Sequence, residues 1–183
     1  MRTPVFTGSC PALATPFDQN GNINYDAFGK LIDAQIAAGV DAVCVCGTTG
    51  ESATMSIREH IAAVEFCVKR VDHRVKVIAG TGSNDTSAAV YLSQHAQDSG
   101  ADACLLVTPY YNKASQTGLI KHYEYIAERI ELPMIPLQRA QPHRGLLYRR
   151  VLQGAGSESQ DQRREGGLRQ LLPAGPHPVP LPR

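Results

Sequence analysis

The sequence lacks the features that would assign a chain to a membrane, to nucleic acid or to secretion. No apolar run approaches the roughly 18 residues that a membrane-spanning helix requires. Residues 1–4 are not followed by the apolar core of a signal peptide. The formal net charge of the 183 residues is only +1, which does not favour nucleic acid or a membrane surface. We therefore expect no membrane and no nucleic-acid partner.

Paired cysteines are also absent. The five cysteines are an odd number without paired spacing, which suits a reducing compartment and predicts a cytoplasmic protein. Cys44 and Cys46 lie two apart on an apolar run typical of a strand, so they are expected to share one face as small barrel-lining or core residues. No second cysteine pair or histidine cluster completes a zinc site, so we expect no metal. Four histidines without ligand spacing are expected on the surface or bonded within the fold: His60, His73, His95 and His122.

Lysine and regular apolar periodicity are missing from the last quarter of the chain. Residues 136–183 contain no lysine, 8 arginines and 3 acidic residues, whereas residues 1–135 carry 5 lysines, 5 arginines and 14 acidic residues. The same tail holds 7 of the 12 prolines and a single aromatic residue, Tyr148. Because proline removes backbone donors and clashes with the preceding helical turn, we expect this tail to be largely irregular. The chain is therefore divided into an ordered part, 1–135, and a tail, 136–183.

The ordered part repeats a pattern of apolar strands and helices at about the length of a βαβ unit. Strands are predicted near residues 8–14, 42–46, 75–79 and 103–107 and from Met134 onward. Amphipathic helices are predicted between them at residues 24–38, 56–71, 86–99 and 116–130. Ser56 and Glu59 have the spacing of a capping box, which places the start of the second helix.

Continuous apolar strands that alternate with helices indicate a parallel sheet covered on at least one side. Four such units are half of an eight-stranded barrel, which usually needs roughly 250 residues. A doubly wound sheet is the alternative, but it favours a glycine fingerprint after its first strand, and residues 14–17 provide none. We therefore predict an α/β fold: the amino-terminal half of a TIM (β/α)8 barrel, with about four βα units and the start of a fifth strand, followed by an irregular Pro/Arg-rich tail.

Polar residues follow three of the strands, at the ends where ligands bind in α/β folds. Residues 47–52 combine turn-forming glycines with adjacent hydroxyls that suit a carboxylate or carbonyl, although a plain strand-to-helix loop has the same spacing. Residues 80–84 lack the Gly-Lys-Ser/Thr ending of a phosphate-binding loop. Residues 108–112 place two tyrosines where they serve proton transfer, packing at a subunit contact, or both.

Five motifs follow one another along the ordered part: Gly8-Ser9, Thr15-Pro16-Phe17, Gly47-Thr48-Thr49-Gly50-Glu51-Ser52, Gly80-Thr81-Gly82-Ser83-Asn84 and Pro109-Tyr110-Tyr111-Asn112. Together they resemble the dihydrodipicolinate synthase family of pyruvate-dependent class I aldolases. The resemblance covers about residues 5–135 without apparent gaps. Its Pro-Tyr-Tyr-Asn element favours the synthases over the sialic-acid and sugar-acid aldolases.

The resemblance implies a barrel enzyme, usually a homotetramer, that condenses pyruvate with L-aspartate 4-semialdehyde through a lysine Schiff base and uses no metal or other cofactor. Thr48 matches the family's proton-relay threonine, and Thr49 matches the residue that holds the pyruvate carboxylate. Tyr111 matches the relay tyrosine that reaches the neighbouring subunit's site. A chain of hydroxyls suits this chemistry, because it moves protons during carbinolamine and enamine formation without a bulky charged base.

The resemblance stops after Ile135 in a way that a shifted reading frame explains. The family continues Leu-Tyr-Asn-Val-Pro-Ser-Arg-Thr-Gly, whereas residues 136–144 read Pro-Leu-Gln-Arg-Ala-Gln-Pro-His-Arg. If the last two bases of each codon are joined to the first base of the next codon, the new codons can encode every one of these family residues. When the codons of residues 161–170 are regrouped in the same way, they can encode the family segment that contains the Schiff-base lysine. That lysine then falls in the codon of Glu165. We hypothesise a one-base insertion near codon 136, real or a sequencing error, and name the chain without it the frame-restored chain.

As written, the chain lacks three residues that the resemblance requires. Leu137 replaces a catalytic tyrosine, Pro142 replaces the arginine that receives the aldehyde substrate's carboxylate, and Glu165 replaces the nucleophilic lysine. A carboxylate cannot form an imine with pyruvate, so this exact chain is expected to be inactive and, as half a barrel, insoluble or molten. A sister aldolase of the sugar-acid or sialic-acid type and a non-catalytic fragment stay open as alternatives. A nucleic-acid module is disfavoured because the arginines of the tail lack interleaved aromatics.

Regulation by lysine is the last property that the resemblance addresses. The positions that match the allosteric pocket of lysine-sensitive members are Ser52, Ala53, His60, Asn84 and Tyr110. Ile57 and Ala88 stand where those members tend to carry a histidine and a glutamate, and a missing carboxylate removes a charge-assisted hydrogen bond to the lysine ammonium. We predict weak or absent inhibition of the frame-restored enzyme by lysine. An inhibition constant comparable to that of sensitive members would contradict this prediction.

Overall fold

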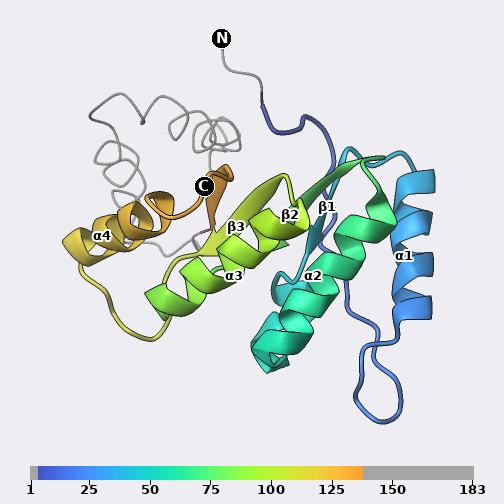
Figure 1. Ribbon diagram of the computed structural model, residues 1–183, viewed down its shortest axis with the longest axis horizontal. Coiled ribbons are helices and arrows are strands. Elements are labelled where there is room, and N and C mark those ends of the chain that lie inside the picture. The colour runs from blue at the N-terminus through green and yellow to red at the C-terminus, as the bar shows by residue number, and fades with distance from the viewer. Residues whose placement is uncertain (1–3, 138–183) are drawn as a thin grey trace, which may run out of the picture.

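The computed structural model describes residues 4–137, in which four parallel strands alternate with four helices. The strands pair in chain order, β1-β2-β3-β4, and two short 3-10 turns follow β1 (Figure 1). The elements are α1 (Tyr25–Ala37), β1 (Ala42–Val45), η1 (Thr48–Gly50), η2 (Ser52–Thr54), α2 (Ile57–Val71), β2 (Lys76–Gly80), α3 (Thr86–Ser99), β3 (Ala103–Val107), α4 (Gln116–Ala127) and β4 (Met134–Leu137).

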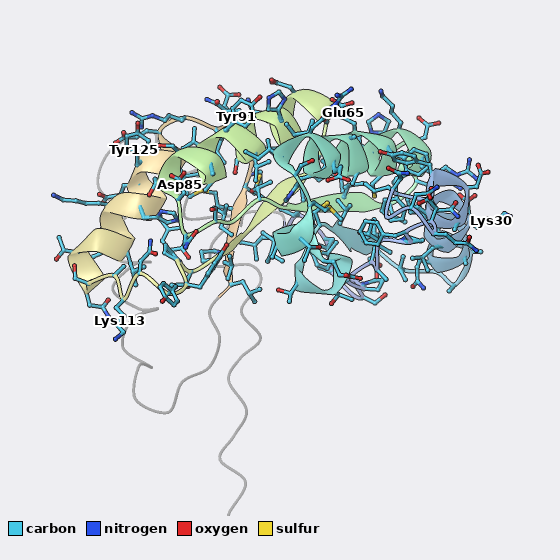
Figure 2. The ribbon with its side chains drawn as sticks, turned by 90° about the horizontal axis from the view of Figure 1, so that it is seen from below. Lys30, Glu65, Asp85, Tyr91, Lys113 and Tyr125 are labelled. Atoms are coloured by element: carbon cyan, nitrogen blue, oxygen red, sulfur yellow. The ribbon has the colours of Figure 1, made fainter. Side chains whose placement is uncertain are left out.

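The described helices cover one face of the sheet. Figure 1 shows α2 and α3 lying across the strands, with α1 and α4 on either side. In Figure 2, which is turned by 90°, Glu65 and Tyr91 point away from the sheet on the outer side of this helical layer. A doubly wound sheet carries helices on both faces, whereas a (β/α)8 barrel adds strands in sequence with all helices outside. The predicted fold, the amino-terminal part of a TIM barrel, is therefore confirmed for the described residues.

Side chains of the strands alternate between two apolar clusters. Those that face the helices, such as Val43 and Val45, are fully buried among residues of all four helices. Those on the other face form a smaller cluster, against which Val5, Phe6 and Cys10 pack: Ala42, Cys44, Ile78 and Ala103. Because hydrophobic stabilisation grows with the apolar area removed from water, the larger cluster on the helix side dominates the stability of the fold.

Side-chain caps fix where the helices begin. Ala27 N donates to Asn24 Oδ1 at 3.0 Å at the start of α1. The predicted capping box of α2 is confirmed, since Glu59 N donates to Ser56 Oγ at 3.3 Å and Ser56 N donates to Glu59 Oε2 at 2.8 Å. Each cap satisfies backbone donors that the first helical turn leaves without partners.

The first predicted strand, residues 8–14, is not a regular strand. It runs beside β1, where Leu13 N donates to Cys44 O at 2.8 Å and Cys44 N donates to Pro11 O at 2.9 Å. In this stretch only Ala12 forms a bridge to β1. Pro11 has no N–H to donate, which interrupts the ladder at its centre. The segment thus lies beside β1, but the prediction of a strand is confirmed only as a single bridge.

The prediction that Cys44 and Cys46 share a face is also wrong. β1 ends at Val45, and Cys46 takes a φ of 55°, in the left-handed region. This turn moves Cys46 into the helix-side cluster, while Cys44 stays on the opposite face. Both are buried core residues, as the sequence indicated.

Two elements end more than one residue away from the positions that the patterns predicted. α4 ends at Ala127 rather than at 130, because the chain must turn back within residues 128–133 to enter β4. β4 extends through Pro136 to Leu137, two residues into the predicted irregular tail, and an edge strand tolerates proline. The rest of the tail, 138–183, with the predictions that concern Pro142 and Glu165, lies outside the described residues. No helix within residues 4–137 is long and apolar enough to cross a membrane.

Two histidines are bonded inside the fold, one of the two outcomes that the sequence allowed. His60 and His122 are each 6 % exposed. His60 Nε2 lies 2.8 Å from Gly80 O, and His122 Nδ1 lies 2.9 Å from Thr86 Oγ1. Burial lowers the pKa of both imidazoles, so each is held in its neutral form.

We predict that mild acid destabilises the fold. Histidines of the unfolded chain, with a pKa near 6.5, take up protons before the buried ones do, so stability present above about pH 6.5 is lost as the pH falls further. The free energy of unfolding should decrease by on the order of 1 kcal/mol per buried histidine between about pH 7.5 and about pH 5.5. Urea unfolding measures it. His122→Gln should lose part of the pH dependence, the surface control His73→Asn should keep it, and a pH-independent midpoint would contradict the prediction.

A second prediction concerns Gly82, where the chain leaving β2 touches β3. A Cβ atom at Gly82 would lie 2.2 Å from Val107 N and 2.9 Å from the Leu106 carbonyl carbon, so alanine forces two backbones apart. Gly82→Ala should lower the free energy of unfolding by about 1–3 kcal/mol. Gly118→Ala in α4 is the matched control, because its Cβ would meet only Ser115 Oγ, at 3.3 Å, and alanine favours helix. Equal effects of the two substitutions in chemical denaturation would contradict the prediction.

Candidate active site

A pocket opens at the carboxyl ends of the strands. The register pairs Val45 with Ala79, Gly80 with Leu105 and Val107 with Leu137, so the strands end at one edge of the sheet, with β3 running two residues beyond the end of β2. The pocket holds about 290 Å³ of space, part of it open to solvent. Its lining residues lie on these strand ends or just after them: Cys46, Gly47, Thr48, Ser52, Gly80, Gly82, Leu105, Val107 and Leu137. Ligands bind at this end of the strands in (β/α) barrels.

The loop after β1 contributes two hydroxyls to the pocket. Thr48 begins η1 and Ser52 begins η2. Between them Glu51 takes a φ of 58°, which reverses the chain and lets one turn follow the other. Thr15, only 4 % exposed, donates its hydroxyl to Gly50 O at 2.8 Å. This buried hydrogen bond ties the loop to the amino-terminal segment and fixes its position.

The segment after β2 meets the pocket through glycines. Thr81 stands between Gly80 and Gly82 but is 1 % exposed, and its Oγ1 lies 2.7 Å from Ser93 Oγ in α3. Thr81 N also donates to Leu105 O of β3 at 3.0 Å. The threonine is therefore anchored in the core, and the two glycines that flank it bring the backbone to the pocket.

Two of the three residues predicted to act in catalysis or pyruvate binding do not line this pocket. Thr49 is exposed in η1, next to Thr48. Tyr111 is 96 % exposed and has a φ of 70°, a strained conformation for a residue with a Cβ. Its loop is held by Asn112, whose Nδ2 donates to Asn84 O at 2.8 Å. The loop thus presents the Tyr111 ring outward, away from the core of its own chain.

The five positions that match an allosteric pocket have different surroundings. Ser52 lines the pocket described above, whereas Ala53 is exposed and His60 is buried. Tyr110 is 51 % exposed. Asn84 Nδ2 donates to Asn112 Oδ1 at 3.4 Å, which links the loops after β2 and β3. Of the five, Ser52 is the one that lines this pocket.

The groups that line the pocket are uncharged. Within residues 4–137, no charged side chain lines it. Burial raises the pKa of the Cys46 thiol to about 12, so this thiol stays protonated at neutral pH and is a poor nucleophile. Hydroxyls and backbone N–H groups can hold a carboxylate or a carbonyl and pass protons, but they need an activated nucleophile for covalent chemistry. The described half of the site therefore suits binding and proton transfer.

Sequence reasoning missed two contributors to the site. Thr15 follows a predicted strand and keeps its alternation with Leu13, which is also buried. A buried hydroxyl needs an internal acceptor, so a supporting role could have been inferred. Cys46 gave no such signal, because its turn away from the strand depends on the close approach of the next strand. That approach is visible only in three dimensions.

Known proteins resemble the chain in both sequence and structure. Residues 5–141 match the dihydrodipicolinate synthetase family. A 4-hydroxy-tetrahydrodipicolinate synthase of Acetivibrio thermocellus is 54 % identical over 135 residues, which are 74 % of this chain and 46 % of that protein. The crystal structure of dihydrodipicolinate synthase from Aquifex aeolicus superposes with a TM-score of 0.70 at 50 % identity, covering 72 % of this chain and 44 % of that one.

A more distant structure extends the comparison. YagE of E. coli K12, a prophage protein of the dihydrodipicolinic acid synthase family solved in complex with pyruvate, gives a TM-score of 0.75 at 33 % identity. It covers 80 % of this chain and 51 % of its own. The chain thus spans about half the length of the relatives that it matches. By the family match and by the close relatives, the chain belongs to the dihydrodipicolinate synthetase family.

Proposed function

We propose that this chain is the substrate-binding half of an enzyme that condenses pyruvate with L-aspartate 4-semialdehyde to 4-hydroxy-tetrahydrodipicolinate through a lysine Schiff base. The observation that carries the proposal is the pocket of neutral hydroxyl and backbone groups at the carboxyl ends of β1–β4. Two structurally similar family members are solved with pyruvate, one of them YagE and the other a synthase from Acinetobacter baumannii. A small 2-oxo acid suits a pocket of this size and chemistry.

The hydroxyl groups take the roles that the chemistry requires. Imine formation between a ketone and a lysine amine releases one water, and each step needs a proton moved to or from oxygen. Thr48 lines the pocket and is the proton-relay residue of this proposal. Thr49 does not line the described pocket, so its proposed role in holding the pyruvate carboxylate rests on the resemblance and on its place beside Thr48 in the same loop. Tyr111 projects outward from its own chain, as it must if it completes the relay in a neighbouring subunit of a homotetramer.

The nucleophile of this enzyme is missing from the chain as written. Leu137 lies at the pocket, where an aliphatic side chain cannot transfer protons, and in the sequence Glu165 stands where the resemblance requires the lysine. We propose that one extra base near codon 136 shifted the reading frame. The second half of a cytoplasmic lysine-pathway enzyme was thereby replaced by an unrelated amino-acid sequence. The similarity supports this origin, because the 135 residues shared with the Acetivibrio relative match the length of the ordered part.

Restoring the frame should restore the activity. The frame-restored chain is expected to condense pyruvate with aspartate semialdehyde and to be inactivated by borohydride in the presence of pyruvate, because reduction traps the imine on lysine. The chain of 183 residues should show neither property. The matched control is the frame-restored chain with the lysine regained at codon 165 changed to arginine, which cannot form the imine. Condensation by the unrestored chain would contradict the proposal.

Substrate profiling of the frame-restored chain distinguishes the sister aldolases. In an aldolase of the sugar-acid or sialic-acid type, borohydride would also trap the imine with pyruvate. Such an enzyme would, however, prefer another aldehyde as the second substrate. Absence of trapping in a folded, frame-restored chain would instead indicate a non-catalytic fragment.

A further inference from the structure

His60 contacts both backbone segments that form the floor of the pocket between β1 and β2. It lies in the first turns of α2, where His60 N donates to Ser56 O at 3.0 Å, and its side chain is 6 % exposed. Its Nε2 lies 2.8 Å from Gly80 O, at the end of β2. Its own carbonyl accepts the thiol of Cys46 at 3.8 Å, just after the end of β1. One helical residue thus bonds to both strand ends.

The two strand ends also touch each other directly. A Cβ atom at Gly80 would lie 2.3 Å from Cys46 O and 3.0 Å from Gly47 N, so the backbones are in contact where no side chain intervenes. Cys46, Gly47 and Gly80 all line the pocket, and the chain continues from Gly47 directly into Thr48. Any movement of Gly80 relative to Cys46 therefore changes the position of the hydroxyl loop.

We propose that His60 is a positioning residue for the reaction: its imidazole holds the Gly80 carbonyl, its backbone holds the Cys46 thiol, and together these bonds set the distance between the threonine loop and the β2 edge of the pocket. We name this group of residues, His60, Gly80 and Cys46, the His60 clamp. The role is indirect, because His60 does not line the pocket. As a role in catalysis the proposal rests on the proposed function, whereas the clamp itself is a property of the fold.

The clamp fixes the tautomer of the imidazole. A carbonyl oxygen can only accept, so Nε2 must carry the proton and donate it to Gly80 O. Neutral His60 is therefore the Nε2–H form, with Nδ1 unprotonated. This assignment gives a readout that does not depend on enzyme activity.

The first experiment measures the tautomer in the chain of 183 residues or, if that chain is insoluble or molten as expected, in the frame-restored chain. Nitrogen-15 NMR of histidine-labelled protein near neutral pH should show a protonated Nε2 and an unprotonated Nδ1 for His60, identified by its absence in His60→Gln. The Nδ1–H tautomer, or fast exchange between the two, would overturn the clamp even if the condensation activity is later established. The expected tautomer together with an inactive frame-restored chain would leave the clamp standing and contradict only its role in the reaction.

The second experiment separates positioning from a general loss of stability. In the frame-restored enzyme, His60→Leu removes the donor, and the KM for pyruvate should rise about tenfold while kcat changes much less, because a misplaced loop weakens substrate binding. His60→Gln, whose amide N–H can still reach the Gly80 carbonyl, should restore most of the affinity. His122→Leu is the matched control, since His122 is equally buried but bonds to Thr86, away from the pocket.

The outcomes are distinct. A raised KM in His60→Leu, with rescue by glutamine and no such change in His122→Leu, supports the clamp. Equal kinetic effects of His60→Leu and His122→Leu would show that only stability is affected and would overturn it. If His60→Leu does not fold, the comparison of His60→Gln with the unchanged enzyme and the tautomer measurement decide the question.

Discussion

The structure depends on the parallel register of its strands. Val45 lies opposite Ala79 and Val107 lies opposite Leu137, so the polar segments that follow β1, β2 and β3 emerge at one edge of the sheet. A shift of one residue in any pair would exchange the two faces of that strand. Side chains such as Val43 or Leu106 would leave the helix-side core, and the residues next to them in the strand would have to fit into it instead. The helix-side core therefore fixes the register, and the register in turn assembles the pocket.

Glycine makes this arrangement possible where the strands end. Gly80 lies against Cys46 O, and Gly82 lies against Val107 N, at distances that a Cβ atom would not allow. The same close approach moves side chains away from the pocket: Thr81 turns into the core, where it bonds to Ser93. The floor of the pocket is thus backbone, supported from behind by buried hydroxyl and imidazole groups.

The fold could be predicted further than the site. Apolar spacing and caps such as Ser56 with Glu59 depend on neighbours three or four residues away, so sequence alone placed the helices to within a few residues. Residues 8–14 pair irregularly because Pro11 has no N–H to donate. The apolar composition of the run predicts a strand without indicating this interruption. The position of Thr48 at the pocket could be predicted because its loop follows a strand. The support of its loop by Thr15 and His60 joins residues far apart in the chain, which no local pattern reveals.

Binding geometry and covalent chemistry are separable in this molecule. The hydrogen bonds that shape the described pocket, from Thr15 to Gly50, from Thr81 to Ser93 and from His60 to Gly80, all lie within residues 4–137. None of the groups they position is a competent nucleophile, since hydroxyls and a thiol with a pKa of about 12 remain protonated. Under the proposed function, a change of sequence after codon 136 would remove the reacting amine but leave the residues that form the described pocket. In a barrel of this kind, the proposed reaction also requires that the second half bring a lysine to the same edge of the sheet.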